Sequence, residues 1–111
     1  MNIQIFGSSK SFDSKKAERW FKERRIKYQY IDLIKKGVSL GEYRSIRSAV
    51  GYDALVQRDS LAYKELGLDY YRPEDAEMKL LEHPELFRAP IVRNGKQATV
   101  GYCPDVWNTW E

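Results

Sequence analysis

The sequence predicts a single α/β domain, an arrangement that some schemes class as α+β. Three observations predict it. A strand, a helix and a second strand fit the first 33 residues, helix signals run from about residue 39 to 83, and Asn94-Gly95 separates two short β-branched runs. With 111 residues, of which 42% are hydrophobic, the chain is long enough for one core. We therefore expect residues 1–111 to form one domain with the element order βαβ, helices, ββα.

The first unit is an apolar strand, a hydroxyl-rich turn, a helix and a second strand. The strand covers about residues 2–6, and Ser11 or Asp13 is predicted to cap the helix, which ends near residue 25. The apolar face of that helix is formed by Ala17, Trp20 and Phe21. Aromatic and β-branched residues predict the second strand at 28–33. A strand, a helix and a strand in some thirty residues favour a βαβ unit, whose strands should be parallel and whose crossover should be right-handed.

The middle of the chain, about residues 39–83, is predicted to be helical. Ser39 and Glu42 have the spacing of a capping box, and this helix should run to about Val50, where Gly51 ends it. Pro73 suits the first position of another helix. Short helices and loops should fill residues 52–68, with these residues packed inside: Leu55, Val56, Leu61, Tyr63, Leu66 and Leu68.

The last unit is a hairpin followed by a helix. Residues 91–93 and 98–100 flank Asn94-Gly95, which predicts an antiparallel pair with a tight turn. Pro104 should start the final helix, with three apolar residues on one side: Val106, Trp107 and Trp110. Together with the first two strands, the hairpin gives a four-stranded mixed sheet.

Composition excludes several classes of function. Nineteen basic residues face sixteen acidic ones, and the two kinds are interleaved, so direct nucleic-acid binding is not predicted. No apolar run is long enough to cross a membrane and no signal peptide is evident, so we expect a cytoplasmic protein. The single cysteine, Cys103, excludes an internal disulfide. With His83 as the only histidine, neither a metal site nor a cofactor is expected.

The turn between the first strand and the first helix is the candidate site. A helix N-terminus leaves backbone N–H groups unpaired and carries a partial positive charge, which suits a nucleophile or a bound anion. This turn contains a lysine and several serines but no cysteine. One interpretation, which we favour, makes Ser11 a helix cap. The other is an anion site formed by Lys10 and Ser11 with Arg88 or Arg58.

Short stretches throughout the chain point to a family. They are Lys15-Lys16-Ala17, Tyr63-Lys64-Glu65-Leu66-Gly67-Leu68, His83-Pro84-Glu85-Leu86, Pro90-Ile91-Val92 and Val100-Gly101-Tyr102. The order of elements is that of the thioredoxin-like fold. The stretches resemble the arsenate reductase and Spx group of glutaredoxin-related proteins, and the resemblance covers nearly the whole chain.

The resemblance implies a cysteine where this chain has Ser11, and often a second one at the position of Ser14. In arsenate reductases the first cysteine attacks arsenate, and glutathione or another thiol completes the reduction. In Spx-type regulators the pair is a redox switch on a protein that binds the C-terminal domain of the RNA polymerase α subunit. A serine hydroxyl is hardly ionised near neutral pH and forms no disulfide, so we expect the inherited reaction to be absent.

The resemblance also places the family's anion-binding arginines and its proline. An arginine usually precedes the proline that aligns with Pro90, whereas this chain has Ala89 there and Arg88 one place earlier. In the middle segment the arginine of one subgroup falls on Asp59, next to Arg58. Pro90 itself resembles the proline that is cis in thioredoxin-like folds and faces the nucleophile loop.

Cys103 has two interpretations. In the first, the thiol is reactive. If Pro104 begins a helix, Cys103 lies at the N-terminus of that helix, whose dipole favours the thiolate. The resemblance also aligns an arginine of one subgroup with Cys103, which would place the thiol near the family's anion-binding pocket. The second interpretation, which we favour, is a small buried apolar side chain.

Three functions follow from the sequence. The first is a redox-inactive protein-binding or regulatory module, for which the RNA polymerase α subunit is a candidate partner by resemblance to Spx and Tyr70-Tyr71-Arg72 a candidate contact. The second is a module that binds an anion or a small thiol. The third is an arsenate reductase or glutaredoxin-like oxidoreductase that uses Cys103, and only this function requires glutathione or another thiol.

Overall fold

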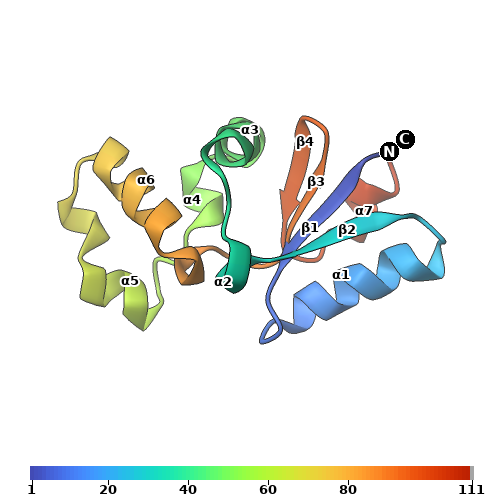
Figure 1. Ribbon diagram of the computed structural model, residues 1–111, viewed down its shortest axis with the longest axis horizontal. Coiled ribbons are helices and arrows are strands. Elements are labelled where there is room, and N and C mark those ends of the chain that lie inside the picture. Colours follow the sequence, from blue (N-terminus) through green and yellow to red (C-terminus); the bar gives the residue numbers. More distant parts are fainter. Residues whose placement is uncertain (111) are drawn as a thin grey trace.

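The fold contains one four-stranded sheet with the strand order β2-β1-β3-β4 (Figure 1). The computed structural model describes residues 1–110. Strand β1 (Ile3–Gly7) pairs in parallel with β2 (Tyr28–Asp32) and antiparallel with β3 (Ile91–Asn94), and β3 pairs antiparallel with β4 (Gln97–Val100). The predicted α/β class and mixed four-stranded sheet are therefore confirmed.

Two helices cover one face of the sheet. Helix α1 (Phe12–Glu23) lies along this face, and the short α7 (Pro104–Trp107) joins it (Figure 1). Trp107 is at the centre of this core, with its ring 5.4 Å from Trp20 and 5.1 Å from Phe21. Its indole N–H donates a hydrogen bond of 2.8 Å to Thr99, which leaves no polar atom of Trp107 unpaired in the core.

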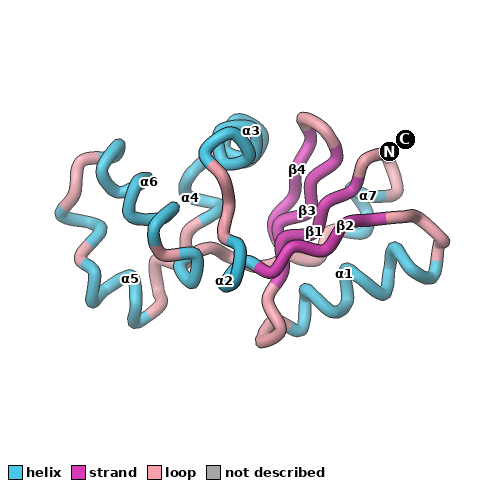
Figure 2. Tube along the Cα trace, viewed as in Figure 1, coloured by secondary structure: helices cyan, strands magenta, loops and turns pink. Residues whose placement is uncertain are grey.

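The other face of the sheet meets a layer of short helices that extends beyond the strands (Figure 2). Phe6, Ile31 and Ile91 contribute to the core between the sheet and these helices. The helical segments are α2 (Leu33–Lys36), α3 (Leu40–Val50), α4 (Tyr52–Leu55), α5 (Leu61–Leu66), η1 (Leu68–Tyr70), α6 (Pro73–Glu82) and η2 (Pro84–Leu86). We call residues 51–86 the helical half.

Several helices begin or end at the capping, glycine and proline residues that the sequence analysis identified. The Ser39 hydroxyl accepts from the Glu42 N–H at 3.2 Å, and the Glu42 carboxylate accepts from the Ser39 N–H at 3.0 Å, which completes the capping box. Gly51 follows that helix with φ at 84°, a conformation that glycine adopts without strain. Pro73 is the first residue of α6.

Leu61, predicted to pack inside, and Val106, predicted to share one side of the last helix with Trp107 and Trp110, are both exposed, which corrects the sequence analysis. Leu61 is 71% exposed because it opens α5 on the solvent side of that helix, whereas Tyr63 of the same helix is buried. Val106 is 44% exposed because α7 is only one turn long and its neighbour Trp107 occupies the buried side. Within residues 1–110, no helix is both long and apolar enough to span a membrane.

Candidate functional site

The loop between β1 and α1 is held by its own serine hydroxyls. Ser11 is the N-cap of α1, and its Oγ accepts the Ser14 N–H at 3.1 Å. Ser14 is buried, and its Oγ accepts the Ser8 N–H at 3.1 Å. The loop closes further through the Ser11 N–H, which donates to the Ser8 carbonyl at 3.0 Å. Ser11 therefore satisfies a backbone donor that a helix N-terminus otherwise leaves unpaired, and Ser14 satisfies a donor of the loop itself.

Gly7 permits the close approach of this loop to strand β2. A Cβ at Gly7 would stand 2.7 Å from Cε2 of Tyr30 and 3.1 Å from Oγ of Ser14. Tyr30 is near the surface and can shift, but Ser14 is bound into the loop. A side chain at position 7 would thus press on the hydrogen bond that shapes the turn.

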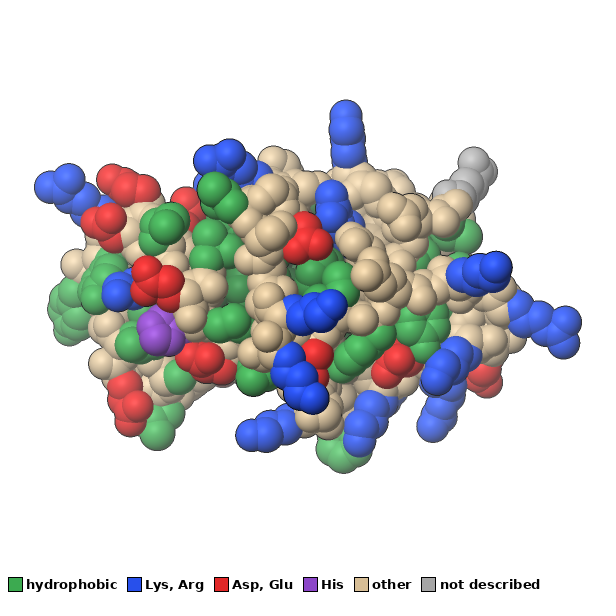
Figure 3. Space-filling model, in the orientation of Figure 1, with side chains coloured by type: hydrophobic (Ala, Val, Ile, Leu, Met, Phe, Trp, Pro, Cys, Tyr) green, Lys and Arg blue, Asp and Glu red, His purple; other side chains and the backbone are tan. Residues whose placement is uncertain are grey.

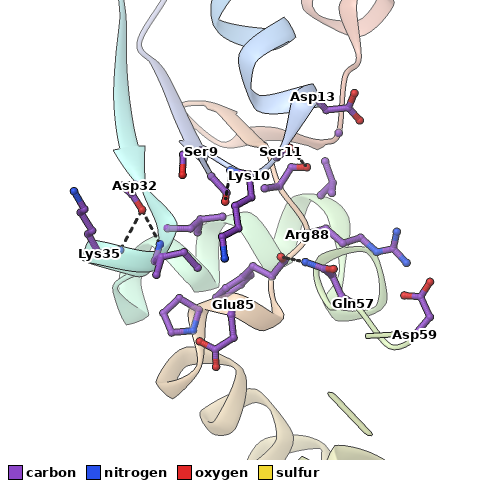
Figure 4. A pocket seen from close by; sticks show the side chains of 18 residues that line it. Ser9, Lys10, Ser11, Asp13, Asp32, Lys35, Gln57, Asp59, Glu85 and Arg88 are labelled. Atoms are coloured by element: carbon purple, nitrogen blue, oxygen red, sulfur yellow. Dashed lines mark hydrogen bonds between the residues drawn. The ribbon is translucent and has the colours of Figure 1, made fainter. Parts of the chain in front are cut away.

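The loop forms one wall of a pocket of about 850 Å³. The pocket lies where the sheet meets the helical half, and its walls come from the β1–α1 loop, from α2, and from the segments around residues 57–59 and 84–89 (Figure 4). Lys10, Ser11 and Arg88, three residues of the predicted anion site, all line it. Ser14 does not, because it is buried behind the loop.

The charges around this pocket are mixed. Its cationic residues are Lys10, Lys35 and Arg88, and its carboxylates are Asp13, Asp32, Asp59 and Glu85. Asp13 lies in the first turn of α1, where its negative charge already interacts with the positive end of the helix. Asp32 caps α2 by accepting the N–H groups of Ile34 and Lys35. A free oxyanion entering the pocket therefore meets both attraction and repulsion.

Lys10 and Arg88 do not point to one spot. Figure 4 shows Lys10 extending into the pocket, whereas Arg88 extends toward Gln57 and Asp59 on the other side. The Nε of Arg88 donates to the Val56 carbonyl at 3.2 Å, which holds this side chain against the segment that follows α4. The arrangement suits a ligand with several polar groups better than one small ion.

The Ala89–Pro90 peptide bond is cis and lies beside the serine loop. The Ser11 hydroxyl is 3.4 Å from the Ala89 carbonyl, to which it donates. The Pro90 carbonyl accepts the Gly101 N–H at 2.8 Å, which fixes the chain after β4 to this segment.

Arg58 corrects the predicted grouping, because it does not line this pocket. Its guanidinium pairs with Asp53 and with Asp69 in the helical half, where it lines a second pocket. Asp53 and Asp69 hold Arg58 in this second pocket, and neither residue belongs to a motif that the sequence analysis used. The predicted set of Lys10, Ser11, Arg58 and Arg88 is therefore divided between two places.

Cys103 does not line the pocket either. It is partly buried, and its thiol donates to the Val100 carbonyl at 3.3 Å. Burial raises the pKa of Cys103, the nearby charge of Asp13 raises it further, and a hydrogen bond with Thr99 only partly opposes them. Although Pro104 does begin α7, that helix has four residues, so its dipole offers little activation.

Sequence reasoning did not single out Asp32 and Glu85 as residues of the pocket. Asp32 had a usable signal, because it ends β2, and the carboxyl ends of parallel strands β1 and β2 lie at one edge of the sheet beside the serine loop. Glu85 had none, since only the fold of the helical half brings it to this edge, whereas Asp59 was indicated by the resemblance, which places a family arginine at its position.

A four-stranded mixed sheet and a cis proline beside a serine-capped helix define a thioredoxin-fold protein without a cysteine in the loop after β1. The sequence matches the model of the ArsC family over residues 6–110. The chain belongs to the ArsC family, and the predicted resemblance to arsenate reductases and Spx proteins is confirmed.

Similar proteins include both branches of that group. The chain is 31% identical over 109 residues to the global transcriptional regulator Spx 2 of Oceanobacillus iheyensis, an alignment that covers 95% of this chain and 80% of that protein. It is 25% identical over 107 residues to Spx of Staphylococcus aureus, covering 93% and 82%. The solved structure of arsenate reductase from Vibrio cholerae superposes with a TM-score of 0.84 at 26% identity, covering 96% and 94% of the two chains.

Proposed function

We propose that this protein is a redox-inactive regulatory module that acts by binding another protein. The observation that carries the proposal is the state of Ser11. The family resemblance assigns the nucleophilic cysteine to this position, and here the hydroxyl is engaged as a helix cap. A serine needs a general base to become a nucleophile, and the described residues that line the pocket include no histidine.

Exposed aromatic side chains support the protein-binding part of the proposal. Tyr70 is 94% exposed at the end of η1, and Tyr71 beside it is 40% exposed. Tyrosine is enriched at protein interfaces because its ring contributes apolar area and its hydroxyl a hydrogen bond. The similarity to proteins named global transcriptional regulators agrees with a regulatory role.

The candidate partner is the C-terminal domain of the RNA polymerase α subunit, by resemblance to Spx. The test is a calorimetric titration of this purified domain, taken from the organism that encodes the chain, into the protein. We expect saturable binding that Tyr70→Ala weakens. Phe12→Ala is a matched control, because Phe12 is also prominent on the surface but lies at the start of α1 and not in the segment that contains Tyr70.

The redox part has a separate test. Thiol-dependent reduction of arsenate and of a model disulfide is measured for the parent, for Ser11→Cys and for Cys103→Ser. We expect no activity in the parent or in Cys103→Ser. Activity in the parent that disappears in Cys103→Ser contradicts the proposal and makes the protein an oxidoreductase with a relocated nucleophile.

One observation favours a second candidate function, the binding of a small thiol. Three cations and four carboxylates around the pocket match a zwitterionic thiol such as glutathione, which carries charges of both signs. Titration of reduced glutathione should then shift the amide signals of Lys10, Asp32 and Arg88 in a nuclear magnetic resonance spectrum. Inorganic phosphate, which is purely anionic, should shift them much less.

A further inference from the structure

A second pocket, of about 360 Å³, lies in the helical half, away from the serine loop. We call it the tyrosine pocket. Three tyrosines and three carboxylates line it: Tyr52, Tyr63, Tyr71, Asp53, Asp69 and Glu77. Negative charge beside the faces of aromatic rings is the environment that recognises an organic cation. Glu77 is bound to Arg47 and Tyr43, whereas Asp53 and Asp69 are the two carboxylates that pair with Arg58.

A cation of the chain itself already occupies the mouth of the pocket. The guanidinium carbon of Arg58 is 5.8 Å from the centre of the Tyr52 ring and 6.0 Å from that of Tyr63. Arg58 pairs with Asp53 and with Asp69, but all three side chains are at least half exposed. Ion pairs between exposed side chains contribute little to stability, so these pairs can be exchanged at small cost.

One polar atom of the residues that line the pocket has no hydrogen-bond partner. The hydroxyl of Tyr52 is inaccessible to solvent and forms no hydrogen bond with any residue that the structure describes. A buried hydroxyl without a partner is unfavourable, and a donor that reaches it once Arg58 has been displaced would relieve it. Tyr63, in contrast, donates to Asp69 at 2.6 Å and is satisfied.

The surroundings also favour a basic partner. Residues 51–86 contain nine acidic and four basic residues, and Figure 3 shows acidic side chains gathered over this end of the molecule. Tyr70, which follows Asp69 and precedes Tyr71 in the chain, offers an exposed apolar ring beside the pocket. A partner that carries a basic residue next to an apolar one would match both features.

We propose that the tyrosine pocket receives an arginine side chain of a protein partner. The incoming guanidinium displaces Arg58 from Asp53 and Asp69, lies between the rings of Tyr52 and Tyr63, and donates to the Tyr52 hydroxyl. Arginine suits the site because its planar group can stack on rings while its N–H groups bind carboxylates. The inference rests on the proposed protein-binding function and adds its surface and the chemistry of its partner.

The test is a nuclear magnetic resonance titration with acetyl-Gly-Arg-Gly-amide. The control peptide replaces arginine by citrulline, which has nearly the same shape and no charge. We expect the arginine peptide to shift the amide signals of Asp53, Tyr63 and Asp69, and the citrulline peptide to leave them in place. The signals of Lys10 and Ser11, in the other pocket, should move with neither.

Variants separate the parts of the proposal. Arg58→Ala empties the mouth of the pocket and should tighten binding several-fold, whereas Arg72→Ala, a matched loss of a nearby arginine, should not. Asp69→Asn keeps the acceptor for Tyr63 but removes a charge, and should weaken binding about tenfold. Tyr52→Phe should weaken binding without lowering thermal stability, because it removes only the unpaired hydroxyl.

Three results overturn the inference: no shift with the arginine peptide, equal shifts with both peptides, or affinity unchanged by Asp69→Asn and Tyr52→Phe. Failure here is distinct from failure of the proposed function. If the polymerase domain binds the parent and the Asp69→Asn variant equally well, the protein-binding function stands and the tyrosine pocket is not its site. If the peptide binds as expected but the polymerase domain does not, the pocket stands and the candidate partner is wrong.

Discussion

Replacing the two loop serines by alanine tests whether their hydroxyls are structural. Ser11→Ala removes the cap of α1, and the loss of such a cap destabilises a protein by about 1 kcal/mol. For a domain of this size, that loss lowers the melting temperature by about 4 °C. Ser14→Ala leaves the Ser8 N–H without its acceptor in a partly buried loop, which costs about 1–3 kcal/mol.

The double variant should lose less than the two single losses added together. Both hydroxyls hold one loop, so a loop loosened by the first change has less to lose from the second, and we expect a deviation of at least about 0.5 kcal/mol. The free energy of unfolding is measured in urea through tryptophan fluorescence, with the exposed Ser9→Ala as the matched control. If Ser11→Ala and Ser14→Ala are both as stable as the parent, the hydroxyls are free for other roles and the structural interpretation is refuted.

Three further predictions concern the core and the titrating side chains. Leu80→Ala in α6 should cost about 2–5 kcal/mol in unfolding free energy, because Leu80 is fully buried. Burial disfavours the charge of Glu77, but hydrogen bonds from Arg47 and Tyr43 outweigh it and lower its pKa below 4.5. The stability that Glu77 contributes is thus present above pH 4.5 and lost as pH falls through its lowered pKa, so Glu77→Gln and the parent should converge in melting temperature at low pH. Burial and the neighbouring Glu18 raise the pKa of Tyr28 to about 12. In an alkaline titration followed by ultraviolet absorbance, Tyr28→Phe should therefore show one fewer tyrosine ionising at high pH than the parent.

Each of these has a result that contradicts it. Met78→Ala, on the exposed side of α6, should cost far less than Leu80→Ala, and equal losses would mean that α6 does not pack as described. A difference between Glu77→Gln and the parent that persists unchanged at low pH would remove the ion pair as its cause. An unaltered alkaline titration in Tyr28→Phe would place the late ionisation elsewhere.

The fold was largely predictable because its boundaries are set by local chemistry. Ser39 with Glu42, and Pro73 at the start of α6, satisfy or avoid backbone donors within a few residues, so the signal and its effect lie together in the sequence. Which side of a very short helix faces the core was not predictable in this way. Leu61 and Val106 are apolar, but helices of six and four residues give too little periodicity to show which side is buried.

The candidate site was predicted in part. The turn at Lys10 and Ser11 follows from a strand that runs into a helix, a local pattern. The partners of Arg58 could not be predicted, because Asp53 and Asp69 meet it only through the packing of three short segments, α4, the turn after it and η1. The mixed charge of the pocket depends in the same way on contacts between segments far apart in the sequence.

The uneven distribution of charge has a consequence for how the protein meets a partner. Residues 10–27, around α1, contain eight basic and three acidic residues, the opposite balance to the helical half. The molecule is 44 Å long, several times the screening length of about 8 Å at physiological ionic strength, so the two ends act separately. A basic molecule approaching by diffusion is turned toward the acidic end before any contact forms, and the rate of encounter should fall steeply as salt is added.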